Sequence, residues 1–261
     1  MRAALFNHNN HLAKLFWESG ARNISELCYA ISQKAPLEDV EKLLERSVPA
    51  ELNQEAAMTP LAEAALVGNL KAVQLLTQHG ADVNRSGILV RGYPESVTTP
   101  LVVAAGEGQD EIVEFLLQHG ARPEPLALRA AANTGITTPP YQRLPSKNHF
   151  ERTVQLLLDA GSLKGLAPEL RGDILVAAIW TRCGGGGDPL VVQALLDAGV
   201  RPDAPAKSRD GAVRPAIEII REEYARGRSM GERGDHFKSF LEMLERAEKG
   251  SAPNGQTPPE R

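Results

Sequence analysis

Cysteine and aromatic residues are scarce in this sequence of 261 residues, which has two cysteines and 5% aromatic residues. Cys28 and Cys183 are too few for a disulfide framework or a multi-cysteine metal site, and this favours a reducing, cytoplasmic compartment. Apolar residues still make up 42% of the chain. We therefore expect a sizeable core built from small and aliphatic side chains.

Neither a basic excess nor a long apolar run is present. The chain carries 29 Lys and Arg against 33 Asp and Glu, a net charge of −4, whereas a dedicated nucleic-acid-binding domain is usually strongly basic. The longest unbroken apolar run covers residues 174–180, far short of the roughly 20 residues of a membrane-spanning helix. Residues 1–10 contain no apolar segment of signal-peptide length. We expect a cytoplasmic protein that binds neither nucleic acid nor a membrane.

Two stretches of the chain share one pattern of residues. The segments that begin with Thr59-Pro60-Leu61 and with Thr99-Pro100-Leu101 each continue with an Ala-Ala pair, a glycine, apolar residues at helical spacing and a closing His-Gly-Ala. The leucine and the closing glycine are 19 positions apart in both segments. This agreement in spacing indicates an internal repeat.

Weaker copies of the pattern extend the repeat over most of the chain. We place a partial first unit at residues 3–23, and further units begin near Leu27, Leu61, Leu101, Leu128, Ile174 and Ala216. The last unit ends in an amphipathic helix over residues 236–249, which would cover the end of the array. We expect one repeat domain over residues 1–249 and a disordered Pro/Gly-rich tail over residues 250–261.

Each unit has the sequence features of two short helices. Threonine is a good N-cap, and proline fits the first helical turn, where its missing N–H has no helical partner. The Ala-Ala pairs allow two first helices to approach closely. Apolar residues such as Ile112 and Val113 mark one face of a second helix, and a glycine is expected to end each helix.

These segments resemble the ankyrin repeat, both in their T-P-L-x-x-A-A-x-x-G part and in the closing Gly-Ala-Asp-Val-Asn that ends at Asn84. The resemblance implies an all-α solenoid of about six helix-turn-helix units with hairpin-like connections. It also implies a protein-binding module without catalysis. In such repeats the two residues after the Ala-Ala pair usually face the binding surface, and here these include Asn133, Thr134, Ile179 and Trp180.

Motifs for catalysis, metal binding or cofactor binding are missing from the sequence. His79 and His119 recur at one position of the repeat, which explains the pair better than a metal site does. The glycines at 184–187 are followed by Asp188-Pro189 and not by the Lys-Ser/Thr of a phosphate-binding loop, so we interpret them as a spacer. We expect no catalytic residues, no metal and no cofactor.

One connection between units is unusually apolar. Residues 85–98 contain Ile88, Leu89, Val90 and Tyr93, where a solvent-facing hairpin is expected. These side chains either fold back onto a neighbouring connection or form a protein-binding tip. The sequence leaves both alternatives open.

Three further insertions, at residues 136–149, 181–187 and 225–235, separate the two helices of consecutive units and should share one edge. They carry charges of +2, +1 and +1 on an acidic chain. This asymmetry suits an acidic partner, although independent drift of three loops would also produce it. The candidate contact residues within the insertions are Tyr141, Arg143, Arg182, Arg226 and Arg228.

Trp180 is the expected anchor of this edge, because Trp and Arg dominate the energetics of protein interfaces. We expect Arg143, Arg182, Arg226 and Arg228 to surround it. The irregular units favour a fitted inhibitor, such as an immunity protein that blocks one toxic enzyme, and we expect a monomer in the absence of that partner. The alternatives are a bacterial effector or scaffold that uses the same surface, and an enzyme with a site in the inserted loops.

Overall fold

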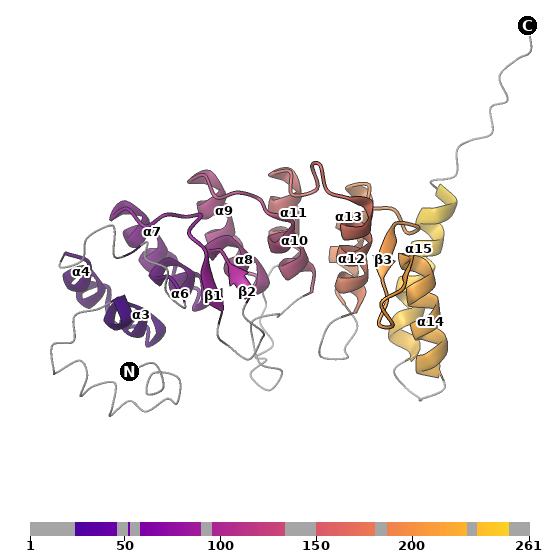
Figure 1. The fold of residues 1–261 in the computed structure, drawn as a ribbon, viewed down its shortest axis with the longest axis horizontal. Coiled ribbons are helices and arrows are strands. Elements are labelled where there is room, and N and C mark those ends of the chain that lie inside the picture. The colour runs from indigo at the N-terminus through magenta and orange to yellow at the C-terminus, as the bar shows by residue number, and fades with distance from the viewer. Residues whose placement is uncertain are drawn as a thin grey trace, which may run out of the picture. The chain divides into compact units, whose positions relative to one another are not determined.

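The computed structural model describes residues 24–45, 52, 58–89, 96–133, 150–180, 187–228 and 234–250. They form two compact units that divide between Arg122 and Pro123. Both units consist of helix pairs, and each contains one antiparallel hairpin (Figure 1). The expected partial unit at 3–23 and the expected tail after residue 250 lie outside the described residues. The single repeat domain over residues 1–249 therefore stays a prediction.

Within the described residues, the first unit contains three helix pairs. They are α3 (Ile24–Ser32) with α4 (Leu37–Glu45), α6 (Pro60–Leu66) with α7 (Leu70–Gln78), and α8 (Pro100–Gly106) with α9 (Asp110–Gln118). The first helices α3, α6 and α8 pack on one another in this order, and the second helices α4, α7 and α9 do the same. Stacking thus buries an apolar face that one pair alone would leave in water.

The helices of the first unit begin and end as the repeat pattern predicts. The Thr59 hydroxyl accepts a hydrogen bond from the Ala62 N–H at 3.2 Å, and Thr99 accepts one from the Val102 N–H at 3.4 Å. A proline occupies the first helical position in both helices. The glycines expected after these helices, at positions 68 and 108, have φ values of +71° and +67°.

The second unit repeats this arrangement. Its described pairs are α10 (Pro125–Ala132) with α11 (Phe150–Asp159), α12 (Pro168–Ile179) with α13 (Pro189–Asp197), and α14 (Ala216–Arg228) with α15 (Gly234–Gly250). The first helices α10, α12 and α14 stack in order, and so do α11, α13 and α15. Helix α15 includes the terminal helix expected over residues 236–249, and its Phe240 and Leu244 are buried.

Within each compact unit, one connection between successive helix pairs is an expected hairpin. Strands β1 (Gly87–Leu89) and β2 (Ser96–Thr98) pair antiparallel, with Ile88 opposite Val97. Strands β3 (Pro205–Lys207) and β4 (Val213–Pro215) pair in the same way, with Ala206 opposite Arg214. The second hairpin packs along α12, and its position determines the geometry of the candidate site.

The core is built from small and aliphatic side chains, as the composition predicts. The alanine pairs Ala104-Ala105 and Ala131-Ala132 have no exposed surface, which fits their expected place between first helices. Among the buried hydrophobic side chains of the described residues, Phe240 is the single aromatic one. In the part of the chain that the structure describes, no helix is long and apolar enough to cross a membrane.

Candidate protein-binding surface

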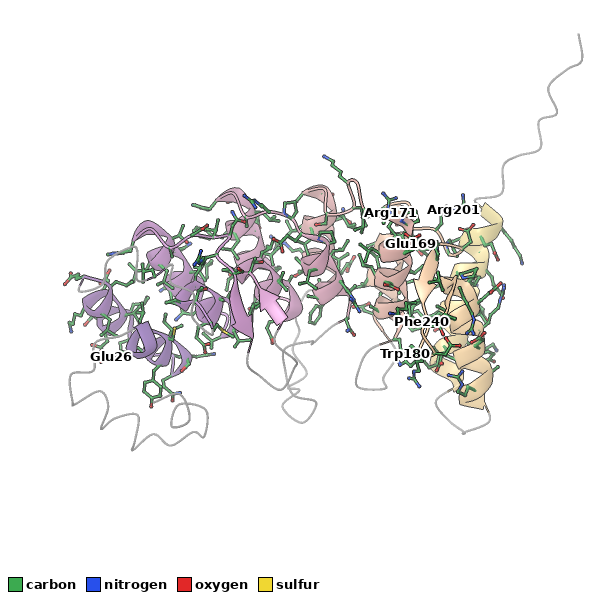
Figure 2. All side chains as sticks on the ribbon, viewed as in Figure 1. Glu26, Glu169, Arg171, Trp180, Arg201 and Phe240 are labelled. Carbon is green, nitrogen blue, oxygen red and sulfur yellow. The ribbon has the colours of Figure 1, made fainter. Side chains whose placement is uncertain are left out.

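Trp180 caps the C-terminal end of α12. Its N–H donates to the Val176 carbonyl at 2.8 Å, and its side chain is half-buried. The chain returns immediately beside it, because the Gly187 N–H donates to the Ile179 carbonyl at 3.1 Å. Figure 2 shows Trp180 at one end of α12, with Glu169 and Arg171 at the other. The expected location of Trp180 at the end of this helix is confirmed.

Ile179 requires a correction. Its side chain is 0% exposed and belongs to the core of the second unit. The repeat pattern identified the two residues after the Ala-Ala pair as surface residues, but a helix turns by about 100° per residue, so adjacent side chains point in different directions. Ile179 therefore supports Trp180 from within the core and offers no contact to a partner.

The β3–β4 hairpin is attached to α12 at two points. Gly172 lies so close to the hairpin that a Cβ there would be 2.2 Å from the Pro205 carbonyl oxygen. One residue further, the Asp173 carboxylate accepts a hydrogen bond from the Lys207 N–H at 2.7 Å. Only glycine allows this approach of a strand to the helix backbone.

These attachments carry the hairpin tip to Trp180. The eight residue-to-residue steps from Gly172 to Trp180, at the end of α12, rise by about 12 Å. The four residue-to-residue steps from Pro205 in β3 to Arg209 in the turn reach at most about 13 Å. Hairpin and helix therefore end together, and the Arg209 guanidinium carbon lies 3.6 Å from the centroid of the Trp180 ring.

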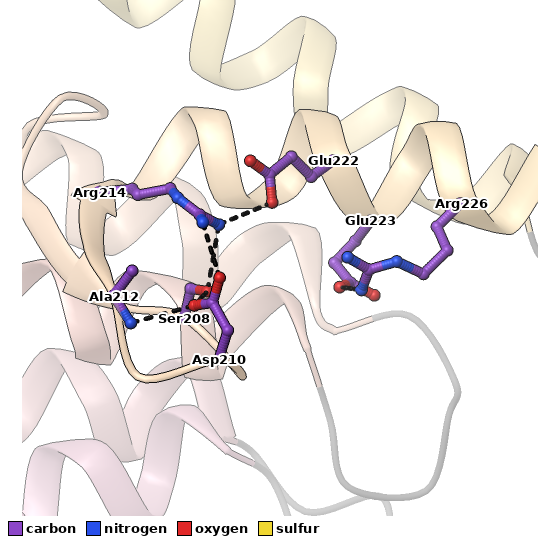
Figure 3. A network of polar contacts seen from close by, with 7 residues as sticks. All are labelled: Ser208, Asp210, Ala212, Arg214, Glu222, Glu223 and Arg226. Carbon is purple, nitrogen blue, oxygen red and sulfur yellow. Dashed lines mark hydrogen bonds and ion pairs between the residues drawn. The ribbon is translucent and has the colours of Figure 1, made fainter.

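A second arginine at the hairpin tip is held by two carboxylates (Figure 3). The Arg214 guanidinium lies 2.6 Å from Asp210 and 3.0 Å from Glu222 of α14, so it fastens the tip to that helix. The Asp210 carboxylate accepts hydrogen bonds from the Ser208 hydroxyl at 2.5 Å and from the Ala212 N–H at 3.0 Å. We call Trp180, Arg209, Asp210, Arg214 and Glu222 the hairpin-tip cluster.

Hydrogen bonds from Ser208, Ala212 and Arg214 stabilise the charged form of Asp210. The Ser208 hydroxyl has the largest effect, followed by the Ala212 N–H, and the Arg214 guanidinium adds to both. Together they lower the pKa of Asp210 to about 2. Asp210 is therefore charged over a wide pH range and stays available as a partner of Arg214.

The other predicted site residues lie in several places. Asn133 caps the C-terminal end of α10, and Arg226 of α14 forms an ion pair with Glu223 (Figure 3). The backbones of Ile88 and Leu89 form part of β1, and that of Arg228 ends α14, while their side chains are outside the description. The predicted residues that lie outside the described residues are Tyr93, Thr134, Tyr141, Arg143 and Arg182.

The expected ring of arginines around Trp180 is therefore untested for most of its members. The cation that does lie on the indole is Arg209, which sequence reasoning missed. Arg209 lies in the connection between α13 and α14, for which the spacing of the repeats predicts a long loop and no particular structure. A signal was present: Asp210-Gly211 between short strand-forming stretches is a strong hairpin sequence. Gly211 has a φ of +83°, which this turn requires.

The described residues offer little to metal or thiol chemistry. No group of three or more His, Cys, Asp or Glu residues could hold a metal ion there. The Cys28 thiol lies 3.8 Å from the Met58 carbonyl oxygen. Burial, and secondarily the negative charge of Glu63, raises the pKa of this thiol, which opposes formation of a reactive thiolate.

The repeat pattern agrees with a known family. A family model described as ankyrin repeats (3 copies) matches residues 27–127. Residues 27–127 of this chain are ankyrin repeats. Ankyrin repeats mediate protein–protein interactions, and their fold is typically a non-enzymatic binding module.

Solved structures agree with the ankyrin fold over most of the chain. One is an ankyrin repeat domain from Acinetobacter baumannii AYE, with 21% identity, a TM-score of 0.52, and coverage of 85% of this chain and 97% of that one. Another is a predatory endopeptidase from Bdellovibrio bacteriovorus in complex with an immunity protein, with 18% identity, a TM-score of 0.51, and coverage of 82% and 96%. The search of curated proteins finds no match.

Proposed function

We propose that this ankyrin-repeat protein binds one protein partner through the hairpin-tip cluster, and that it acts as an immunity-type inhibitor. In this role it blocks an enzyme that is toxic to the cell that makes both proteins. The proposal places the chain in the cytoplasm as a monomer until it meets its partner. The observation that carries the binding site is the stack of Arg209 on Trp180 at 3.6 Å.

This stack has the properties of an interface anchor. Trp and Arg are the residues most often found at energetic hot spots, because they combine a large apolar area with directional hydrogen bonding. Trp180 is half-buried, so its ring is already held in place while part of it remains open to a partner. A preorganised anchor loses less conformational entropy on binding than a freely rotating one.

The inhibitory role is supported by two further observations. The units of the repeat are irregular in length, and Trp180 directly precedes the inserted segment 181–187, as expected of a surface fitted to one partner. A structural neighbour was solved as an endopeptidase in complex with an immunity protein. An inhibitor of this type needs no catalytic group, only a surface that covers the partner's active site.

The immunity role is tested by depleting the chain from the cell that makes it. We expect loss of viability, because the partner enzyme is then uninhibited, and we expect recovery when the gene of the captured partner is also removed. Capture uses the full chain as bait, with mass spectrometry to identify the bound protein. A depleted cell that grows normally, while foreign host proteins are captured, would instead support an effector.

The binding site is tested in the same capture with two variants. Trp180→Ala removes the anchor, whereas Leu126→Ala removes an exposed apolar side chain from the first turn of α10. We expect Trp180→Ala alone to lose the partner, with circular dichroism unchanged in both variants. Equal recovery by the two variants would place the site elsewhere.

A further inference from the structure

Arg209 has a guanidinium that lies on the Trp180 ring and has no carboxylate partner among the residues that the structure describes. One face of the group lies on the Trp180 ring, and the residue is exposed. A guanidinium that lies on an aromatic ring can still donate hydrogen bonds from the edge of its plane. Among the described residues, none forms an ion pair or side-chain hydrogen bond with Arg209.

The neighbouring arginines differ from Arg209 in this respect. Arg214 is bound by Asp210 and Glu222, and Arg221 of α14 by Glu245 and Glu248 of α15. Arg201, at the start of the same connection, contacts both carboxylate oxygens of Asp203 at 2.9 and 2.7 Å. The chain thus supplies carboxylates to these arginines, while the described residues supply none to Arg209.

The backbone beneath Arg209 is held in place, and the Trp180 ring provides the contact for its guanidinium. Asp173 binds the Lys207 N–H, and the close approach at Gly172 leaves β3 no room to shift toward the helix. Arg214 holds the other side of the tip on α14. A planar donor fork that is already oriented matches the two oxygens of a carboxylate and gains more from that contact than a mobile side chain does.

We propose that Arg209, stacked on Trp180, binds a carboxylate that the partner protein presents on an Asp or Glu side chain. This inference rests on the proposed function, since it names the chemistry that the hairpin-tip cluster recognises in the partner. The carboxylate lies in the plane of the guanidinium and accepts from its edge. The apolar stem of the same partner residue contacts the part of the indole that Arg209 leaves open.

The test needs no identified partner. The full chain, labelled with ¹⁵N, is titrated with N-acetyl-aspartate N-methylamide, and the Arg209 Nε–H and Trp180 indole N–H signals are followed by NMR at constant ionic strength. The matched probe is N-acetyl-asparagine N-methylamide, which has nearly the same shape and no charge. We expect saturating shifts of both signals with the aspartate probe and several-fold smaller shifts with the asparagine probe.

Variants locate the effect. Arg209→Gln should abolish the shift of the Trp180 signal, and Arg209→Lys should weaken it, because lysine keeps the charge but loses the planar fork. Arg201→Gln, which removes an arginine that already has a carboxylate, should leave the shift unchanged. Equal responses to the two probes, no response to either, or persistence of the shift in Arg209→Gln would each overturn the proposal.

A titration with inorganic phosphate separates carboxylate from other anions. Saturation by phosphate at lower concentration than by the aspartate probe would contradict the assignment of a carboxylate. The proposed function is judged by a different measurement, namely loss of the partner in Trp180→Ala. A failed titration with intact dependence of capture on Trp180 would remove only the inference about Arg209, whereas the reverse result would remove the binding site.

Discussion

The Arg209 guanidinium carbon lies 3.6 Å from the centroid of the Trp180 ring, which joins the tip of the β3–β4 hairpin to the end of α12. The two residues are 29 positions apart in the sequence. They meet because β3 runs along α12, held by the contact at Gly172 and the hydrogen bond to Asp173. The contact between Arg209 and Trp180 therefore depends on the position of the whole hairpin along α12.

Removal of the stacked cation should expose Trp180 to water. The sequence contains one other tryptophan, Trp17, so a Trp17→Phe background isolates the fluorescence of Trp180. In this background we expect Arg209→Gln to shift the emission maximum to longer wavelength and to destabilise the fold by no more than about 1 kcal/mol, since the pair is partly exposed. An unchanged emission maximum would show that Arg209 does not cover the ring in solution.

The close approach at Gly172 gives a second test. A methyl group there would collide with the Pro205 carbonyl oxygen at 2.2 Å, and neither backbone can move aside easily. We expect Gly172→Ala to destabilise the protein by about 1–3 kcal/mol in chemical unfolding and to shift Trp180 emission as Arg209→Gln does. Gly250→Ala is the control, since its new Cβ would meet no atom within 4 Å; similar stability of the two variants would argue against the contact.

Much of the fold could be predicted from the sequence because local signals and repeat spacing agree. Thr59 and Thr99 cap their helices, and the alanines at 104 and 105 are buried between helices, as expected. The site was less predictable because it depends on a contact between distant segments. Nothing local to Trp180 indicates that Arg209 covers it. The repeat pattern predicts an exposed Ile179, but this side chain, one position before Trp180 on the helix, is buried in the core.

The hairpin-tip cluster should make stability sensitive to acid. The pKa of Asp210 is lowered in the folded protein from 3.8 to about 2. A lowered folded pKa stabilises the protein above the unfolded value, and this contribution disappears as the pH falls from about 4 toward 2. Thermal melts should therefore show Asp210→Asn below the parent at neutral pH, with the difference shrinking below about pH 4. A difference that stays constant over this range would contradict the role of the charge.

Cys28 should be inert in the folded protein. Burial and the nearby charge of Glu63 raise the pKa of its thiol, and a thiol in this state is a poor nucleophile. In a Cys183→Ser background, we expect iodoacetamide at pH 8 to modify Cys28 much more slowly than a free model thiol, with full labelling in denaturant. Labelling of the native protein at the rate of a free model thiol would mean that the thiol is accessible.

The central claim is that the partner binds where Arg209 and Trp180 meet. Its most direct test is the Kd of the captured partner for the parent chain, for Trp180→Ala and for Leu126→Ala, measured by calorimetry at one salt concentration. We predict that Trp180→Ala weakens binding at least roughly thirtyfold, since loss of such an anchor typically costs about 2 kcal/mol or more, and that Leu126→Ala binds as the parent does. A Kd for Trp180→Ala within about twofold of the parent, well below the effect of a lost anchor, would contradict the account and would make the connection at residues 85–98 the better candidate.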